Sequence, residues 1–362
     1  MAAGVWDSSQ NLSTSASNTT DGLSLKERCA RDGREKMASV GIIGLGAYVP
    51  PHEMSNADWA EIVETNDEWI TTKTGMKKRR IADKNTHTSD LAVEACKRAL
   101  DDAGLVASDI DLLILATSSP DVPLSSTAGI VQHKLGCVDC GAFDINAVCA
   151  GWVHALDVGA RYVGTPGYDK VLVVGSEIYS RILNWQDRTT CVLFGDGAGA
   201  AVLGEVPEGK GVLGTWLMSD GGGADVIVIP AGGVRTPIPS EGFEEGMQYF
   251  HMDGPAVWEF AIEAFPQAVH GALARVDKTI EDVDFVIAHQ ANINIIKTGM
   301  EKLGLPMSKT FTNLHKYGNT AGASVPIAMR EAMDNGLIKE GDLVVTAAFG
   351  GGLAWGANVI QF

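Results

Sequence analysis

The sequence lacks the excess of basic residues that binding to nucleic acid requires. Its 362 residues include 28 lysines and arginines against 45 acidic residues, which gives a formal net charge of −17 at pH 7. A phosphate-binding surface depends on Lys and Arg, so this balance argues against a nucleic-acid partner. The sequence also has no apolar run long enough to span a bilayer, and we therefore expect no membrane-embedded segment.

Cysteine is scarce as well. Six cysteines in a chain of this length do not resemble the dense framework of a small secreted disulfide protein. Cys137 and Cys140 have the spacing of metal ligands, with His133 upstream, but a structural zinc site needs about four ligands and no second CxxC follows. We interpret the pair as part of a connecting loop and expect no bound metal, with a metal or redox centre as the alternative.

The first 36 residues contain no apolar core of a signal peptide. They are rich in Ser, Thr and Asn and carry both acidic and basic residues, whereas a transit peptide is poor in acids. We expect residues 1–36 to be a disordered extension, with organelle import as the alternative. The protein is predicted to be cytoplasmic, and its globular part is expected to begin near Met37.

Glycine is plentiful, but its patterns do not match a nucleotide-binding loop. "GLGAYVP" runs into two prolines, and both "FGDGAGAAVLGEV" and "FGGGLAWGA" continue into β-rich segments. A phosphate-binding glycine loop should instead open a helix. We attribute these glycines to tight turns and close approaches of the backbone.

Similar segments recur at a fixed distance along the chain. "DIDLLILA" at Asp109 resembles "DVDFVIAH" at Asp282, and "DKVLVVGS" at Asp169 resembles "DLVVTAAF" at Asp342, in both cases 173 residues later. Short β-branched runs alternate with helical patterns throughout, which favours an α/β fold. A repeat this long predicts two similar βαβ-rich halves, 37–210 and 211–362, with a site where they meet.

The segment "DINAVCAG" places Cys149 between a predicted strand and a predicted helix. Free cysteines are often simply buried, but backbone N–H groups at a helix start favour the thiolate and can stabilise an oxyanion. His289 ends the repeated strand of the second half. Asn319 lies in a turn that is the counterpart of the cysteine turn. We expect these three side chains to meet, with a structural role for His289 as the alternative.

Several of these segments together resemble one family. "DINAVCAG", "FGDGAGAAVL", "HQANI", "YGNTAGASVPIA" and "FGGGLAWG" are similar to signature segments of β-ketoacyl-acyl carrier protein synthase III, which has the thiolase fold. The resemblance extends from about Val40 to Phe362. It implies a layered α/β/α/β/α arrangement of two duplicated halves.

The resemblance also implies an acyltransferase that initiates fatty acid biosynthesis. Cys149, His289 and Asn319 would form its catalytic triad, and the backbone N–H groups of Cys149 and Gly351 its oxyanion hole. An acyl group would pass from coenzyme A to Cys149 and then condense with a decarboxylating malonyl-acyl carrier protein. Coenzyme A enters as a thioester substrate, and no further cofactor is implied.

The same resemblance implies a set of substrate-binding residues and a homodimer. Trp69 would stack on the adenine of coenzyme A, with Arg188 on the other face of the adenine or on phosphate, and the cluster Lys77–Arg80 would lie near the 3′-phosphate. The other implied substrate-binding residues are Lys73, Leu124, Asn292 and Phe194.

Four positions depart from the common family pattern. Lys73 and Asn294 stand where Arg is usual, Glu301 where Lys is often found, and Leu124 where a Phe often closes the acyl pocket across the dimer. These departures leave open an alternative function, a polyketide-type relative with an unusual primer.

Overall fold

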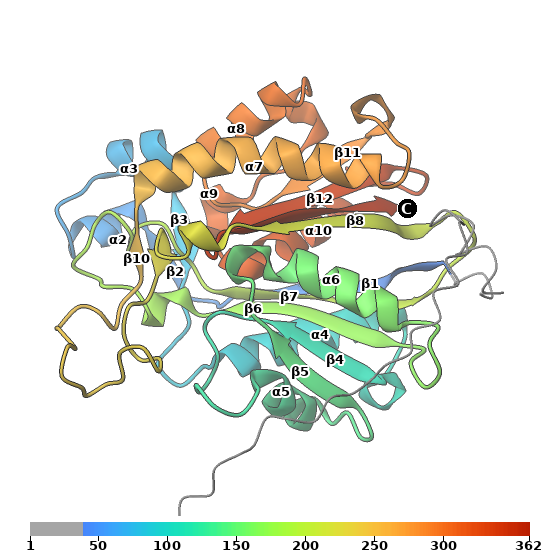
Figure 1. Cartoon of the computed structure of the whole chain (residues 1–362), viewed down its shortest axis with the longest axis horizontal. Helices are drawn as coiled ribbons and strands as arrows, with labels where there is room; N and C mark the ends of the chain where they lie inside the picture. The colour runs from blue at the N-terminus through green and yellow to red at the C-terminus, as the bar shows by residue number, and fades with distance from the viewer. Residues whose placement is uncertain (1–38) are drawn as a thin grey trace, which may run out of the picture. The chain divides into compact units, whose positions relative to one another are not determined.

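Two β-sheets form the framework of residues 39–362, the part of the chain that the computed structural model describes (Figure 1). The expected extension over residues 1–36 lies outside the described residues. The first sheet has the strand order β1 (Val40–Tyr48), β7 (Gly197–Glu205), β6 (Val171–Glu177), β4 (Leu112–Ala116), β5 (Gly141–Ile145). The second has the order β11 (Phe285–Ala288), β12 (Leu343–Gly350), β13 (Ala354–Gln361), β8 (Gly211–Ser219).

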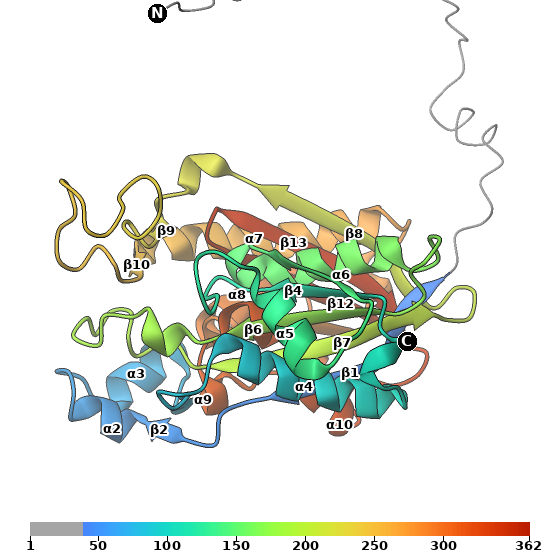
Figure 2. The same ribbon diagram turned by 90° about the horizontal axis from the view of Figure 1, so that it is seen from below.

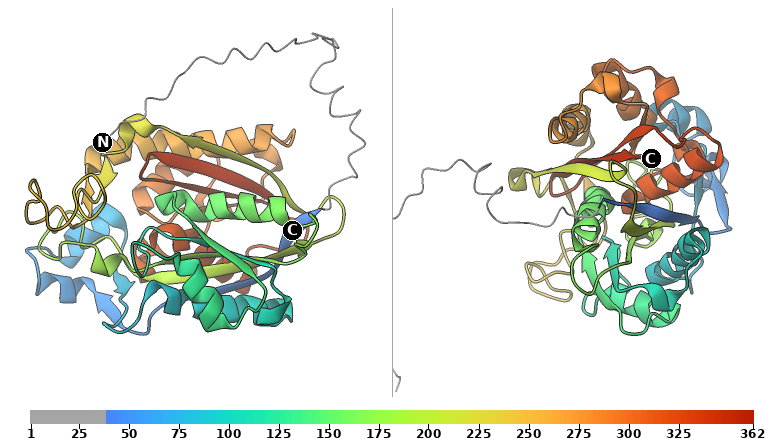
Figure 3. Two further views of the ribbon diagram at one scale, coloured as in Figure 1. Left: turned by 60° about the horizontal axis from the view of Figure 1, so that its bottom comes forward. Right: turned by 90° about the vertical axis from the view of Figure 1, so that its right-hand side faces the viewer.

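Helices cover both faces of each sheet, which gives the expected five layers. The outer face of the first sheet is covered by α4 (Thr88–Ala103) and α5 (Thr127–Leu135), and that of the second by α7 (Gly254–Ala274) and α8 (Ile293–Lys302). Between the sheets lie α6 (Gly151–Tyr162) and α10 (Ser324–Asp334), as Figure 3 shows from two further sides. Because both faces are covered, β6 and β12 are buried along their whole length.

Two small ribbons and three short α-helices lie toward one end of the sheets, and single 3₁₀ turns occur at both ends. Two small ribbons pair β2 (Glu53–Ser55) with β3 (Lys78–Arg80) and β9 (Ile227–Val228) with β10 (His251–Met252). The short α-helices are α2 (Asn56–Ala60), α3 (Asp67–Thr74) and α9 (Leu314–Tyr317). Single 3₁₀ turns are η1 (Ala107–Asp109), η2 (Val148–Ala150), η3 (Tyr179–Arg181), η4 (Gly221–Gly223), η5 (Ile280–Asp282), η6 (Met307–Lys309) and η7 (Ala321–Ala323). Figure 2 shows the segment between β9 and β10 projecting beyond this end of the molecule.

The repeated segments of the sequence occupy equivalent elements. β4 and β11 begin 173 residues apart, as do η2 and η7, and α6 and α10. Both 3₁₀ turns open with a non-glycine residue in the left-handed region, Val148 at φ 47° and Ala321 at φ 44°. A β-branched residue is strained there, so the turn before Cys149 is held by its surroundings. Apart from the two small ribbons, the strands before residue 210 form the first sheet, and those after it form the second.

Candidate active site

The turn that contains Cys149, the predicted nucleophile, lies at the carboxyl end of the first sheet. β5 ends at Ile145, the turn η2 contains Cys149, and α6 begins two residues later. The Asn146 side chain accepts a hydrogen bond from the N–H of Val148 (3.2 Å), which helps to hold the strained turn. Cys149 is therefore at the strand-to-helix junction that the sequence predicts, and it is 7% exposed.

His289 and Asn319 reach the same region from the second half. His289 follows β11 directly, and its N–H donates to the carbonyl of Ala347 on β12 (2.8 Å). Asn319 lies beside Phe194 in an isolated β-bridge. The N–H of Asn319 donates to the carbonyl of Leu193 (2.9 Å), and the carbonyl of Asn319 accepts from the N–H of Gly195 (3.0 Å). Both side chains are buried.

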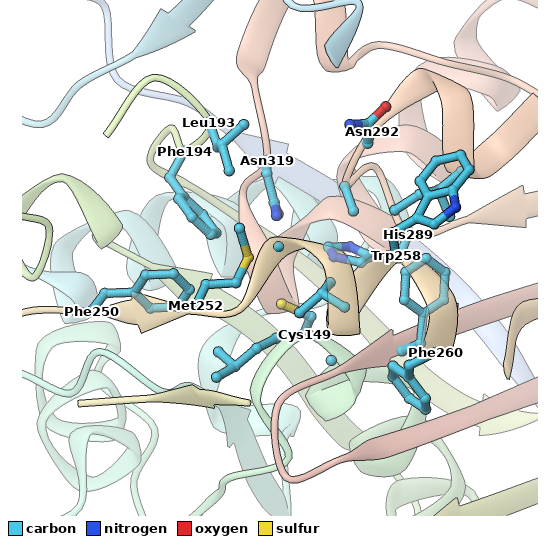
Figure 4. A pocket seen from close by; sticks show the side chains of 17 residues that line it. Cys149, Leu193, Phe194, Phe250, Met252, Trp258, Phe260, His289, Asn292 and Asn319 are labelled. Atoms are coloured by element: carbon cyan, nitrogen blue, oxygen red, sulfur yellow. The ribbon is translucent and has the colours of Figure 1, made fainter. Parts of the chain in front are cut away.

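One cavity of about 180 Å³ is lined by all three predicted catalytic side chains. Figure 4 shows Cys149, His289 and Asn319 pointing toward a common space. Phe349 contacts the edge of the His289 ring, with 5.4 Å between ring centres, and the other walls are mostly apolar. The structure thus brings together the three residues that the sequence singled out, in mostly apolar surroundings.

The protonation state of Cys149 differs from the expectation. The helix start was expected to favour the thiolate, but burial and the nearby Glu177 carboxylate raise the pKa of the Cys149 thiol. Glu177 ends β6 and accepts hydrogen bonds from the side chains of Thr117, Ser118 and Ser119, while burial raises its own pKa to about 7. Burial also lowers the pKa of His289 to about 3. The resting site therefore contains a neutral thiol and a neutral imidazole.

Gly350 packs directly against Cys149. A Cβ at this position would lie 2.7 Å from the Cβ of Cys149, which only glycine avoids. The peptide that joins Gly350 to Gly351 consequently lies beside Cys149. Gly351 itself lines a second cavity, together with His154. The oxyanion-hole role of its N–H stays a prediction.

The predicted coenzyme A residues lie around α3, and one of them also reaches the cavity. The guanidinium of the exposed Arg188 lies 5.6 Å from the centre of the Trp69 ring. The side chain of Asn292 lines the catalytic cavity and donates to the carbonyl of Lys73 (3.0 Å). Asn294 donates to the same carbonyl (3.0 Å), so these two asparagines join α8 to the end of α3. The Lys73 side chain is exposed.

The basic cluster Lys77–Arg80 does not form the positive surface that we expected. Arg79 is fully buried and donates from Nε to the carbonyl of Val192 (2.8 Å). Lys78 and Arg80 both pair with Glu53, at 2.6 and 3.2 Å. In the extended strand β3 alternate side chains point to opposite faces, so consecutive basic residues cannot share one surface. Within this cluster, the described ion pairs include Lys78 and Arg80 but neither Lys77 nor Arg79.

Phe194 lines the cavity as expected, whereas Leu124 was expected to reach the acyl pocket of a second copy, and that role stays a prediction. Phe194 stacks on Tyr179, with 4.7 Å between ring centres. Leu124 is 89% exposed on the loop between β4 and α5 and is not among the residues that line the cavity of its own chain. Sequence reasoning missed much of the remaining wall, namely Ile227, Phe250, Met252, Val257, Trp258 and Phe260. The apolar start of the helical segment "GPAVWEF" was the available signal for the last three.

The other cysteine motif of the sequence, "CVDC", does not line this cavity. Cys137 and Cys140 are free thiols in the turn between α5 and β5, as the loop interpretation expects. Within residues 39–362, no three His, Cys, Asp or Glu side chains gather in the way metal ligands do. Over the same residues, no helix combines the length and apolarity needed to cross a membrane.

Known proteins match nearly the whole described chain. Models of 3-oxoacyl-[acyl-carrier-protein] synthase III match residues 143–221 and, for its C-terminal part, residues 273–362. The β-ketoacyl-[acyl-carrier-protein] synthase III of Caldanaerobacter subterraneus subsp. tengcongensis is 48% identical over 91% of this chain and 99% of its own. The chain belongs to the β-ketoacyl-[acyl-carrier-protein] synthase III family.

Two further members of this family match the chain over a similar length. The synthase III of Clostridioides difficile is 46% identical over 89% of this chain and 98% of its own. The crystal structure of the Thermus thermophilus synthase III has a TM-score of 0.83 and 41% identity, and covers 89% of this chain and 99% of that one. The thiolase-like fold and the acyltransferase class are therefore confirmed, and the polyketide-type alternative is not favoured.

Proposed function

We propose that this chain condenses an acyl-CoA primer with malonyl-acyl carrier protein through an acyl-Cys149 intermediate, and so initiates fatty acid biosynthesis. Its membership of the synthase III family supports this reaction. The convergence of Cys149, His289 and Asn319 in one buried apolar cavity is the observation that carries it.

The first half of the reaction transfers the acyl group. The Cys149 sulfur attacks the thioester carbonyl, the bond from that carbon to the coenzyme A sulfur breaks, and the thiol proton ends on the departing sulfur. The N–H groups of Cys149 and Gly351 hold the transient oxyanion. Because burial disfavours a free thiolate, proton loss accompanies attack rather than preceding it.

The second half forms the carbon–carbon bond. The malonyl thioester loses CO₂, and the electron pair moves to an enolate whose oxygen accepts hydrogen bonds from His289 and Asn319. The enolate carbon attacks the acyl-Cys149 carbonyl. The Cys149 sulfur leaves as a thiolate and takes one proton from solvent, and the β-ketoacyl chain stays on the carrier. These steps need no metal or redox group.

Acyl-CoA, malonyl-acyl carrier protein and a second copy of the chain are the proposed partners. The pairing of Trp69 with Arg188 supports an aromatic adenine site. The exposed apolar side chains of Val122 and Leu124, on one loop, support a surface that a second copy covers. Light scattering tests this association, and a monomer with full activity at nanomolar concentration would contradict it.

We also propose a cytoplasmic location and a division into halves at about residue 210. Five free cysteines among the described residues support a reducing compartment. The assignment of one sheet to each side of residue 210 supports the two halves.

An initial-rate panel tests the function. It measures β-ketoacyl product from acyl-CoA primers of increasing length with malonyl-acyl carrier protein as the second substrate. We expect turnover with at least one primer, and mass spectrometry should find its acyl group on Cys149. Absence of both with every primer would contradict the proposal.

A further inference from the structure

A buried serine that does not line the cavity contacts one ring nitrogen of His289. The Oγ of Ser324, the first residue of α10, lies 2.6 Å from Nδ1 of His289. The same Oγ accepts a hydrogen bond from the N–H of Gln290 (3.3 Å). Ser324 and His289 are each 1% exposed, so solvent does not compete for these groups.

The Ser324 hydroxyl proton has one acceptor among the described residues. The Gln290 N–H is itself a donor and cannot accept, which leaves Nδ1 of His289. A buried hydroxyl without an acceptor costs roughly 1–3 kcal/mol, so the serine proton is directed to Nδ1. A neutral imidazole that accepts at Nδ1 carries its own proton on Nε2. Burial disfavours the doubly protonated ring.

We propose that Ser324 is a positioning residue that holds His289 in the Nε2–H form, so that this ring presents a donor to the thioester oxygen of the second substrate. The inference rests on the proposed function. In the other form, a lone pair on Nε2 would face the growing negative charge of the enolate oxygen.

Asn319 is fixed in a matching way. The N–H of Ala321 donates to its Oδ1 (2.8 Å), so its Nδ2 amino group is the end left to donate into the cavity. Both donors are thereby set before the substrate arrives, and no reorganisation is required when the charge develops.

The duplication supports a paired role for the two residues. The counterparts of His289 and Ser324, 173 positions earlier, are Ala116 and Gly151. These two also adjoin one another, because a Cβ at Gly151 would lie 3.1 Å from the Cβ of Ala116. The half without the histidine thus also lacks the hydroxyl, at the same pair of neighbouring positions.

The experiment separates the two half-reactions and observes the histidine ring directly. With ¹⁵N-histidine, ring NMR of the wild-type protein should show the His289 proton on Nε2, with the signal assigned by its absence in His289→Gln. Ser324→Ala should shift this proton toward Nδ1. The variant should slow decarboxylation of malonyl-carrier about tenfold or more, because a preorganised donor is lost. Acyl-Cys149 formation in a rapid-quench assay should change less than about twofold, because its oxyanion is held by other N–H groups.

Two further variants serve as controls. Ser324→Thr keeps the hydroxyl and should restore decarboxylation. Ser176→Ala removes another buried hydroxyl, which donates to the carbonyl of Thr88, and should leave the ratio of the half-reactions unchanged.

Each outcome decides the inference. A His289 proton on Nδ1 in the wild-type protein overturns it, even if Ser324→Ala does not fold. If Ser324→Ala slows both half-reactions equally, or slows neither, the inference is also overturned. Failure of the wild-type enzyme with every primer would instead contradict the proposed function, and the ring spectrum would still report on the Ser324 contact.

Discussion

The guanidinium of Arg188 lies 5.6 Å from the centre of the Trp69 ring, and its Nη1 donates to the carbonyl of Glu64 (2.8 Å). An adenine ring between these two groups would need them slightly further apart, because each stacked layer takes about 3.5–4 Å. The exposed arginine can make that adjustment.

We therefore expect Trp69→Ala to raise KM for acyl-CoA about tenfold while kcat changes little. Stacking on an aromatic side chain is worth roughly 1–3 kcal/mol per base. Initial rates with acyl-CoA and with acyl-pantetheine, which lacks the adenine, provide the comparison. An equal loss with both substrates would place Trp69 outside the adenine site.

Cys149→Ala should abolish acyl-enzyme formation and leave the fold intact. The side chain lies in a cavity, so the lost sulfur removes little packing. Intact-protein mass spectrometry after incubation with acyl-CoA measures the label. Cys140→Ala, which removes a partly exposed thiol outside the cavity, is the control and should still be acylated. Acylation that survives in Cys149→Ala would refute the assignment.

In Glu177→Gln, the rate of Cys149 alkylation should rise at a lower pH than in the wild-type protein. The pKa of Glu177 is raised to about 7, so its carboxylate is charged above that pH and disfavours the neighbouring thiolate. Removing the charge lowers the pKa of Cys149 and makes the thiolate available earlier as pH rises. Iodoacetamide rates from pH 6 to 10 measure the shift. Asp196→Asn, another buried carboxyl, should leave the profile in place.

Leu124→Phe should narrow primer choice. We expect the wild-type enzyme to accept chains longer than acetyl more readily than the variant does, because an aliphatic side chain leaves a more adaptable boundary to the acyl site in the proposed dimer. One or two methylene groups in an apolar pocket are worth about 1–3 kcal/mol, so the preference should change by some tens-fold. Strict acetyl selectivity that is unaltered in the variant would contradict this expectation.

The carrier interaction can be tested at Glu301. Asn294, where the family usually has Arg, is a poor position for this test. Its side chain joins α8 to α3, and an arginine there would lose these hydrogen bonds. Glu301 is exposed on α8, beside Lys302, which pairs with Glu263. Lys309 instead donates to the carbonyl of Val283 and is partly buried.

We expect Glu301→Lys to lower KM for an acidic malonyl-carrier about two- to fivefold, since rim charges act mainly on encounter and are screened by salt. The effect should grow at low ionic strength. Glu340→Lys makes the same charge change at an exposed position outside the catalytic cavity and should have little effect. Equal responses of the two variants would show that only net charge matters.

The sequence alone determined the architecture and the three central residues. The 173-residue repeat predicted two similar halves, because equivalent strands and helices need similar apolar patterns. The position of Cys149 between a strand and a helix was readable because both elements are local. The family resemblance supplied the roles of His289 and Asn319.

Tertiary structure decided the chemical state of these residues. The pKa of Cys149 depends on burial and on Glu177, which lies on another strand, so the local helix start gave the wrong direction. Arg79 is a surface charge by composition but a core residue in the fold, because its strand turns it toward Val192. Ser324 meets His289 across 35 positions of sequence. Such effects arise from contacts between distant segments, and no local pattern contains them.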